Sequence, residues 1–101
     1  MDDFPRLSAK EALILRMLLD KGEAYGLEMV HESTGALKRG TIYVTLSRME
    51  DKGFVESRKE ELPPAAAGAP RRMYRASGHG AQVLSAWETA GAILSRHMEV
   101  A

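Results

Sequence analysis

Apolar residues recur at helical spacing near the start of the chain. Residues 8–22 read SAKEALILRMLLDKG, and their broad apolar side consists of Leu13, Ile14, Met17 and Leu18. Ser8 and Glu11 have the Ser-x-x-Glu spacing of a capping box, in which each side chain accepts a backbone N–H of the other residue. Gly22 is a typical residue just beyond a helix end. The pattern predicts a helix over these residues.

Two shorter segments show the same periodicity. Residues 25–35, YGLEMVHESTG, space Leu27 and Val30 three apart and end at a glycine. The next segment, residues 41–52, has one apolar side formed by Ile42, Leu46 and Met49. Apolar residues three and four apart line one side of a helix. We therefore expect three helices in the first half of the chain.

The period changes after residue 53. FVESRKEEL (54–62) and RRMYRAS (71–77) contain β-branched or aromatic residues among polar ones, and PPAAAGAP between them is typical of a turn. These segments predict a two-stranded antiparallel hairpin that packs on the helices, because an isolated hairpin is marginal in water. Helical spacing returns at Gly78 and continues to the end, which predicts one long final helix.

This order of elements predicts the fold class. Three helices followed by a hairpin form a winged helix-turn-helix, which is mainly α with a small antiparallel β-hairpin. In such folds the third helix enters the major groove of DNA and the hairpin lies beside it. We expect residues 1–77 to form a winged-helix DNA-binding domain and residues 78–101 a C-terminal dimerisation helix.

Composition limits the alternatives. With 101 residues and 45% apolar content the chain buries one modest core, and small domains are often stabilised by oligomerisation. Cysteine is absent, which excludes disulfides and thiolate metal sites. The opening residues MDDFPR resemble neither a secretory signal nor a membrane span. We expect a soluble, cytoplasmic protein with no contact to a membrane.

The net charge is zero, but the charges are unevenly distributed. Residues 1–32 hold seven acidic and four basic residues, whereas residues 36–48 hold three basic residues and no acid. A second acid-free segment, residues 69–76, contains three arginines. The basic residues of the two segments are Lys38, Arg39 and Arg48, then Arg71, Arg72 and Arg75. Two such segments favour a polyanionic partner, although solvated surface charges would give the same pattern.

The third predicted helix places suitable groups opposite its apolar side. At 100° per residue this outer side carries Thr41, Val44, Thr45, Arg48 and Lys52. Lys38 and Arg39 precede the helix start, where free backbone N–H groups favour phosphate. Tyr43 lies on the flank, where its hydroxyl would donate to a phosphate or its ring would pack against the hairpin.

The final helix carries a long apolar stripe formed by Leu84, Trp87, Gly91, Leu94 and Met98. Burying a large apolar side chain contributes roughly 1.5 to 3 kcal/mol to stability. If the stripe stayed exposed, several such contributions would be lost. The stripe therefore predicts a homodimer interface, with packing against the chain's own helices as the alternative. Trp87 would line an effector cavity at this interface or belong to the core.

Enzymatic chemistry has little support in the sequence. His31, His79 and His97 show no metal-ligand spacing with one another or with acids. The serines of the last helix have no adjacent base, and the chain has no glycine-rich phosphate loop. We expect no catalytic residues, no metal and no cofactor.

Three stretches together resemble a known family. AYGLEMVHESTG, GTIYVTLSRMEDKGFVESR and GAPRRMYRASGHG are similar, in order and spacing, to the PadR-type transcriptional regulators over roughly residues 8–90. The resemblance implies a homodimer, paired through its first and last helices, that binds a pseudo-palindromic operator in double-stranded DNA and usually represses transcription. Some relatives release DNA when a small aromatic effector binds.

The resemblance also implies site residues. It places six on the DNA side of the third helix: Lys38, Arg39, Thr41, Tyr43, Thr45 and Arg48. Arg71 and Arg72 are implied phosphate or minor-groove contacts of the wing, the hairpin of the fold. The wing tip, LPPAAAGAP, departs from the family's more polar turn. The competing hypothesis is a winged-helix protein-interaction module without DNA binding.

Overall fold

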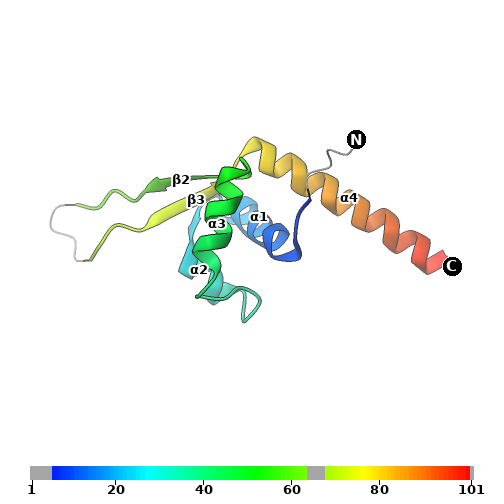
Figure 1. Cartoon of the computed structure of the whole chain (residues 1–101), viewed down its shortest axis with the longest axis horizontal. Helices are drawn as coiled ribbons and strands as arrows, with labels where there is room; N and C mark the ends of the chain where they lie inside the picture. The colour runs from blue at the N-terminus through cyan, green and yellow to red at the C-terminus, as the bar shows by residue number, and fades with distance from the viewer. Residues whose placement is uncertain (1–5, 64–67, 101) are drawn as a thin grey trace.

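The computed structural model describes residues 6–63 and 68–100, with side chains up to residue 92. Within these residues four helices and three strands follow one another (Figure 1). They are α1 (Ala9–Lys21), β1 (Ala24–Tyr25), α2 (Gly26–Glu32), α3 (Ile42–Asp51), β2 (Val55–Lys59), β3 (Arg72–Ala76) and α4 (Gly78–Val100). The predicted order of three helices, a hairpin and a final helix is confirmed.

The start of α1 has the predicted capping box. The Ser8 hydroxyl accepts the Glu11 N–H at 3.1 Å, and the Glu11 carboxylate accepts the Ser8 N–H at 2.9 Å. Gly22 ends the helix with φ 85°, a left-handed conformation that favours glycine. The fully buried side is rotated slightly from the predicted one, because Leu15 is buried whereas Leu13 and Met17 are only partly so.

The sheet contains the predicted hairpin and one further strand. β2 and β3 pair antiparallel from Val55↔Ala76 to Lys59↔Arg72. β1 adds to the other edge of β3, with Ala24 opposite Tyr74, so the strand order is β1-β3-β2. A strand of two residues is too short to show an alternating pattern, which is why the sequence did not reveal it.

The core lies between the helices and one face of the sheet. Its largest fully buried side chains are Ile14, Leu15, Leu18, Met29, Ile42, Leu46, Met49, Val55 and Leu84. Tyr74 of β3 is also buried. The core therefore includes residues of α4.

The first turns of α4 belong to the winged-helix body. A Cβ on Gly80 would overlap the Phe54 carbonyl oxygen, so helix and loop are in backbone contact there. Val83 and Leu84 join the core, and Arg16 of α1 donates to both carboxylate oxygens of Glu88 at 2.6 and 2.8 Å. Packing is thus continuous across residue 78, where the boundary between the two predicted parts was expected.

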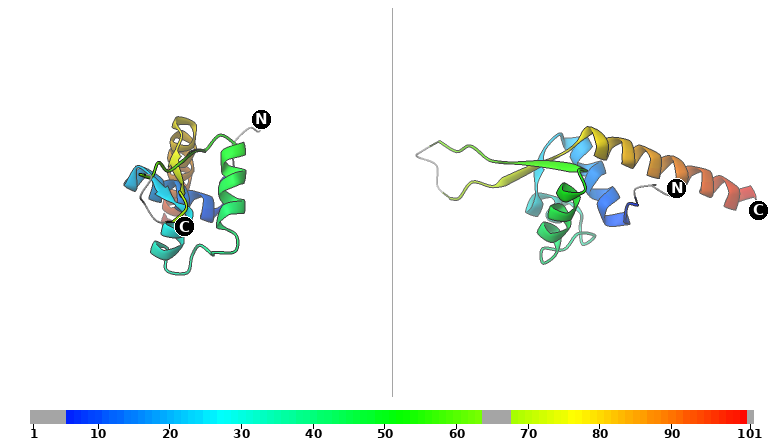
Figure 2. Two further views of the ribbon diagram at one scale, coloured as in Figure 1. Left: turned by 90° about the vertical axis from the view of Figure 1, so that its left-hand side faces the viewer. Right: turned by 45° about the horizontal axis from the view of Figure 1, so that its top comes forward.

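Two elements project in opposite directions from this body (Figures 1 and 2). The hairpin β2–β3 extends to one side and the second half of α4 to the other, and the principal extents are 61 × 29 × 22 Å. The radius of gyration is 15.8 Å, above the roughly 13 Å of a compact domain of this size. None of the helices in the described residues has the length and apolar character needed to cross a membrane.

Candidate nucleic-acid interface

α3 lies at the margin of the helical body and has one open side (Figure 2). Its buried residues are Ile42, Leu46 and Met49, as the periodicity predicted. The opposite side exposes Thr41, Tyr43, Val44, Ser47, Arg48 and, at the helix end, Asp51, with Thr45 partly covered. The Thr45 hydroxyl donates to the Thr41 carbonyl at 3.1 Å, so its proton is already used within the helix.

The loop before α3 holds basic side chains at the helix start. Leu37 is buried, and its N–H donates to the Ser33 hydroxyl at 2.9 Å, which fixes the loop on the core. The N–H groups of Thr41 and Ile42 both donate to the Lys38 carbonyl, at 3.2 and 3.0 Å. Lys38 and Arg39 are exposed at this turn. Both cations therefore lie at the N-terminal end of α3, where Arg39 also lines a pocket with Leu27, Val30 and His31 of α2.

Ion pairing separates the basic residues into two groups. Arg16, Lys21, Lys52, Arg58 and Arg75 each contact a carboxylate at 3.7 Å or less. Among the side chains that the structure describes, no ion pair involves Lys38, Arg39 or Arg48. The open side of α3 consequently carries positive charge that the chain does not itself neutralise.

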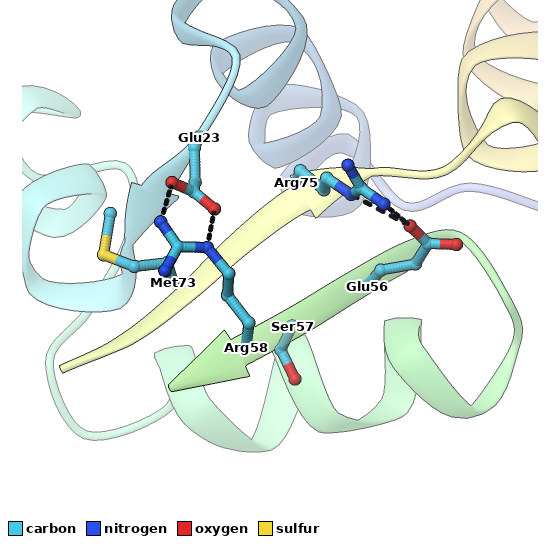
Figure 3. A pocket seen from close by; sticks show the side chains of 6 residues that line it. All are labelled: Glu23, Glu56, Ser57, Arg58, Met73 and Arg75. Carbon is cyan, nitrogen blue, oxygen red and sulfur yellow. Dashed lines mark hydrogen bonds and ion pairs between the residues drawn. The ribbon is translucent and has the colours of Figure 1, made fainter. Parts of the chain in front are cut away.

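The sheet face turned away from α3 is charge-compensated (Figure 3). Arg58 donates through Nε and Nη2 to the two carboxylate oxygens of Glu23, both at 2.7 Å, and Arg75 pairs with Glu56 at 2.9 Å. The hydrogen bond from Arg58 lowers the pKa of the Glu23 carboxyl. Met73 lies beside the Glu23–Arg58 pair, and with both pairs and Ser57 it lines a shallow pocket. Both arginines are already neutralised, so neither offers free positive charge to an anion.

Arg71 and Arg72, in the acid-free segment 69–76, lie on opposite faces of the hairpin. Neighbouring residues of a strand point to opposite faces, so Arg72 lies on the face of Ser57 and Tyr74, and Arg71 on that of Met73. Arg72 donates to the Ser57 hydroxyl at 3.1 Å, which in turn donates to Glu50 of α3 at 2.8 Å. Arg71 instead lies over the Tyr25 ring, 4.5 Å from its centroid. Of the two predicted wing residues, Arg72 is the one linked to α3.

Tyr43 packs at the start of α2. A Cβ added to Gly26 would lie 2.8 Å from the Tyr43 Cε1, so the ring rests directly on this glycine. The side chain is nevertheless 47% exposed. Its ring thus contacts the neighbouring helix α2, and donation of its hydroxyl to a phosphate stays a prediction.

A groove between α1 and α3 contains a basic residue that the sequence analysis did not select. Its lining comprises Ser8, Lys10, Glu11, Thr45, Arg48 and Lys52. Lys10 belongs to the net-negative first segment of the chain, and only the packing of α1 on α3 brings it close to Arg48. No signal in the sequence indicates this neighbour.

In the same groove Lys52 is tied to Glu11. Its ammonium lies 2.8 Å from the Glu11 carboxylate, which is almost fully buried. Burial raises the pKa of Glu11, but the hydrogen bonds from Lys52 and from the Ser8 N–H outweigh this effect, so the net pKa lies below the ordinary value. Lys52, predicted on the outer side of the helix, thereby holds the end of α3 against α1.

The apolar stripe of α4 divides along its length. Leu84 is 1% exposed and packs in the core of its own chain, so it is not available to a second copy. Trp87 is 42% exposed and Gly91 is exposed. The side chains of Leu94 and Met98 lie outside the described residues. The surface available for pairing thus begins at Trp87.

Both the sequence and the fold of the chain are similar to those of known proteins. The model of the transcriptional regulator PadR-like family matches residues 14–86. No curated protein sequence matches the chain. The structure is similar to that of a PadR family transcription regulator from hypervirulent Clostridium difficile R20291, with 27% identity, a TM-score of 0.73, and coverage of 91% of this chain and 96% of that one.

Two further solved structures share the fold. A PadR family transcriptional regulator from Eggerthella lenta DSM 2243 has 24% identity and a TM-score of 0.74, covering 89% of this chain and 78% of its own. Bacillus subtilis PadR, solved in complex with operator DNA, has 24% identity and a TM-score of 0.68. That match covers 82% of this chain and 48% of the Bacillus chain.

Proposed function

The chain belongs to the PadR-like family of transcriptional regulators, and from this we propose that it is a homodimeric, sequence-specific DNA-binding protein that represses transcription. The observation that carries the proposal is the cationic open side of α3. Lys38, Arg39 and Arg48 are exposed and have no carboxylate partner among the described side chains. An uncompensated cationic surface on a helix favours a polyanion.

In the proposed complex α3 lies in the major groove of double-stranded DNA. Lys38 and Arg39 contact phosphates on one side of the groove, and Lys10 with Arg48 contacts phosphates on the other. Thr41 and Thr45 lie nearest the base edges, while Arg72 contacts the backbone from the wing. Tyr43 donates its exposed hydroxyl to a phosphate, and Arg71, held over Tyr25, reaches the backbone farther along the wing. Phosphate contacts set the position of the protein and base contacts select the sequence.

The dimer is proposed to form through the projecting part of α4. This helix spans 23 residues, or about 35 Å at 1.5 Å per residue. Trp87 supplies an exposed aromatic anchor, Gly91 permits close approach of the partner helix, and Leu94 and Met98 continue the sequence stripe. Paired recognition helices about 34 Å apart would reach successive half-sites of a pseudo-palindromic operator. The exposed indole would also offer a stacking surface for a small aromatic effector.

Titration of the protein onto duplex DNA from upstream of its own gene tests the proposal. Neutralising ~6 phosphates predicts that affinity falls by roughly a thousandfold between about 50 and 200 mM salt. The double variant Arg39→Ala/Arg48→Ala should weaken binding without changing the thermal midpoint. Arg75→Ala is the matched control, because Arg75 is neutralised by Glu56 on the face away from α3, and its affinity should stay within about twofold of wild type.

Absence of binding, or binding that does not respond to salt, would contradict the proposal. The alternative would then be a winged-helix protein-interaction module. The exposed Leu19 and Trp87 are the observation in its favour, because such side chains are typical anchors of protein interfaces. A module of this kind has no physical reason to keep residues 36–48 free of acids.

A further inference from the structure

Val44 is an exposed apolar side chain on the otherwise polar open side of α3. It is 53% exposed, the largest fraction among the exposed large hydrophobic residues of the described chain. Thr41 lies three residues before it and Arg48 four residues after it, so the three side chains follow one line along the helix. An apolar group thus stands between a hydroxyl and a guanidinium at the centre of the cationic surface.

The surroundings of Val44 indicate what covers it. Lys38, Arg39 and Arg48 favour a polyanion over an apolar protein surface, since none of them is neutralised within the described side chains. Val44 is the third residue of α3, and recognition helices contact base edges through their N-terminal residues. The apolar group that base pairs present in the major groove is the C5-methyl of thymine.

We propose that Val44 packs against a thymine methyl and so specifies thymine at one position of each half-site. This inference rests on the proposed DNA-binding function and adds a base preference to it. Thr45, the neighbouring candidate, is less suited to direct readout because its hydroxyl proton is bound to the Thr41 carbonyl at 3.1 Å. Its oxygen can still accept a hydrogen bond but does not donate one. Val44 is therefore the principal base-reading side chain of this line.

Deoxyuridine substitution tests the contact, because it removes the thymine methyl and leaves base pairing unchanged. A duplex selected by the wild-type protein from a random pool is resynthesised with each thymine replaced in turn. At one position in a half-site the wild-type affinity should fall roughly fourfold, the equivalent of one buried methyl group. As the DNA control, deoxyuridine replaces a thymine that lies outside the half-sites.

Two variants assign the effect to Val44. Val44→Ala should bind the thymine and deoxyuridine duplexes with equal affinity at that position. Val44→Thr keeps the β-branched shape and one methyl, and should retain part of the discrimination. Because the side chain of residue 44 is exposed, the thermal midpoints of both variants should match that of the wild type.

The outcomes separate this inference from the function on which it rests. Salt-dependent DNA binding with no sensitivity to any thymine methyl would overturn the inference alone. Sensitivity that persists unchanged in Val44→Ala would also overturn it, because another residue would then read the methyl. Failure to bind any duplex would overturn the proposed function and this inference together.

Discussion

Gly26 and Tyr43 show how a single contact links two helices of the proposed interface. The Tyr43 ring lies where a Cβ of residue 26 would stand, at 2.8 Å from Cε1. We expect Gly26→Ala to lower the free energy of unfolding by about 1–3 kcal/mol through overpacking. Gly40→Ala is the control, because a Cβ there meets nothing within 4 Å and the backbone φ is ordinary.

A double-mutant cycle checks that the loss arises from this contact. In a Tyr43→Ala background the added methyl has room, so Gly26→Ala should cost much less than in wild type, giving a coupling energy above about 0.5 kcal/mol by urea denaturation. Strictly additive effects would show that the ring and the glycine do not meet.

The Glu11–Lys52 pair predicts a pH dependence of stability. The folded-state pKa of Glu11 lies below its ordinary value of 4.5, so its ionised form stabilises the fold above that pH. This contribution is lost as the pH falls through the lower folded-state pKa. Glu11→Gln should cost roughly 1–2 kcal/mol at pH 7 and less at pH 3, as measured by denaturation at both pH values. An equal cost at both would exclude the ion pair as the cause.

At the scale of elements, Gly80 sets how α4 leaves the sheet. A Cβ at this position would overlap the Phe54 carbonyl oxygen and approach Leu15 to 3.0 Å. Gly80→Ala should therefore lower the thermal midpoint, with a loss of about 1–3 kcal/mol. Gly78→Ala, two residues earlier, meets nothing within 4 Å and should leave stability within about 0.5 kcal/mol of wild type. Equal effects of the two variants would disprove the close contact.

The sequence could predict those elements that are long enough to show a repeating pattern of apolar residues. The three N-terminal helices, the hairpin and the final helix have repeating apolar positions, and the family resemblance in their motifs is confirmed over residues 14–86. β1 has two residues and no readable period. Three site features depend on packing between distant segments: Lys10 in the groove, Lys52 on Glu11, and the link from Arg72 through Ser57 to Glu50. Periodicity gives the exposed side of a helix, but it does not give the neighbours that a tertiary contact brings there.

At the scale of the whole molecule, the projection of α4 beyond the body has a testable consequence. The core reaches as far as Leu84 and the Arg16–Glu88 ion pair, so the fold does not depend on the residues that follow. A chain that stops after Ala90 should unfold cooperatively, with a thermal midpoint near that of the full chain. The same chain lacks Gly91 and the rest of the sequence stripe, and should therefore be monomeric by analytical ultracentrifugation.

Loss of the dimer should be visible in DNA binding through the number of half-sites. The shortened chain should bind a duplex with one half-site as well as the full chain does, because α3 and its basic residues are unchanged. On a duplex with two half-sites it should bind roughly 10²–10⁴-fold more weakly than the full chain, since the avidity of two linked sites exceeds the affinity of one by about this factor. A shortened chain that remains dimeric would place the interface at Trp87 and α1, whereas equal affinity for both duplexes in the full chain would show that two copies do not act together. Stability, association and DNA binding thus respond separately to one truncation, and each tests a different part of the proposed assembly.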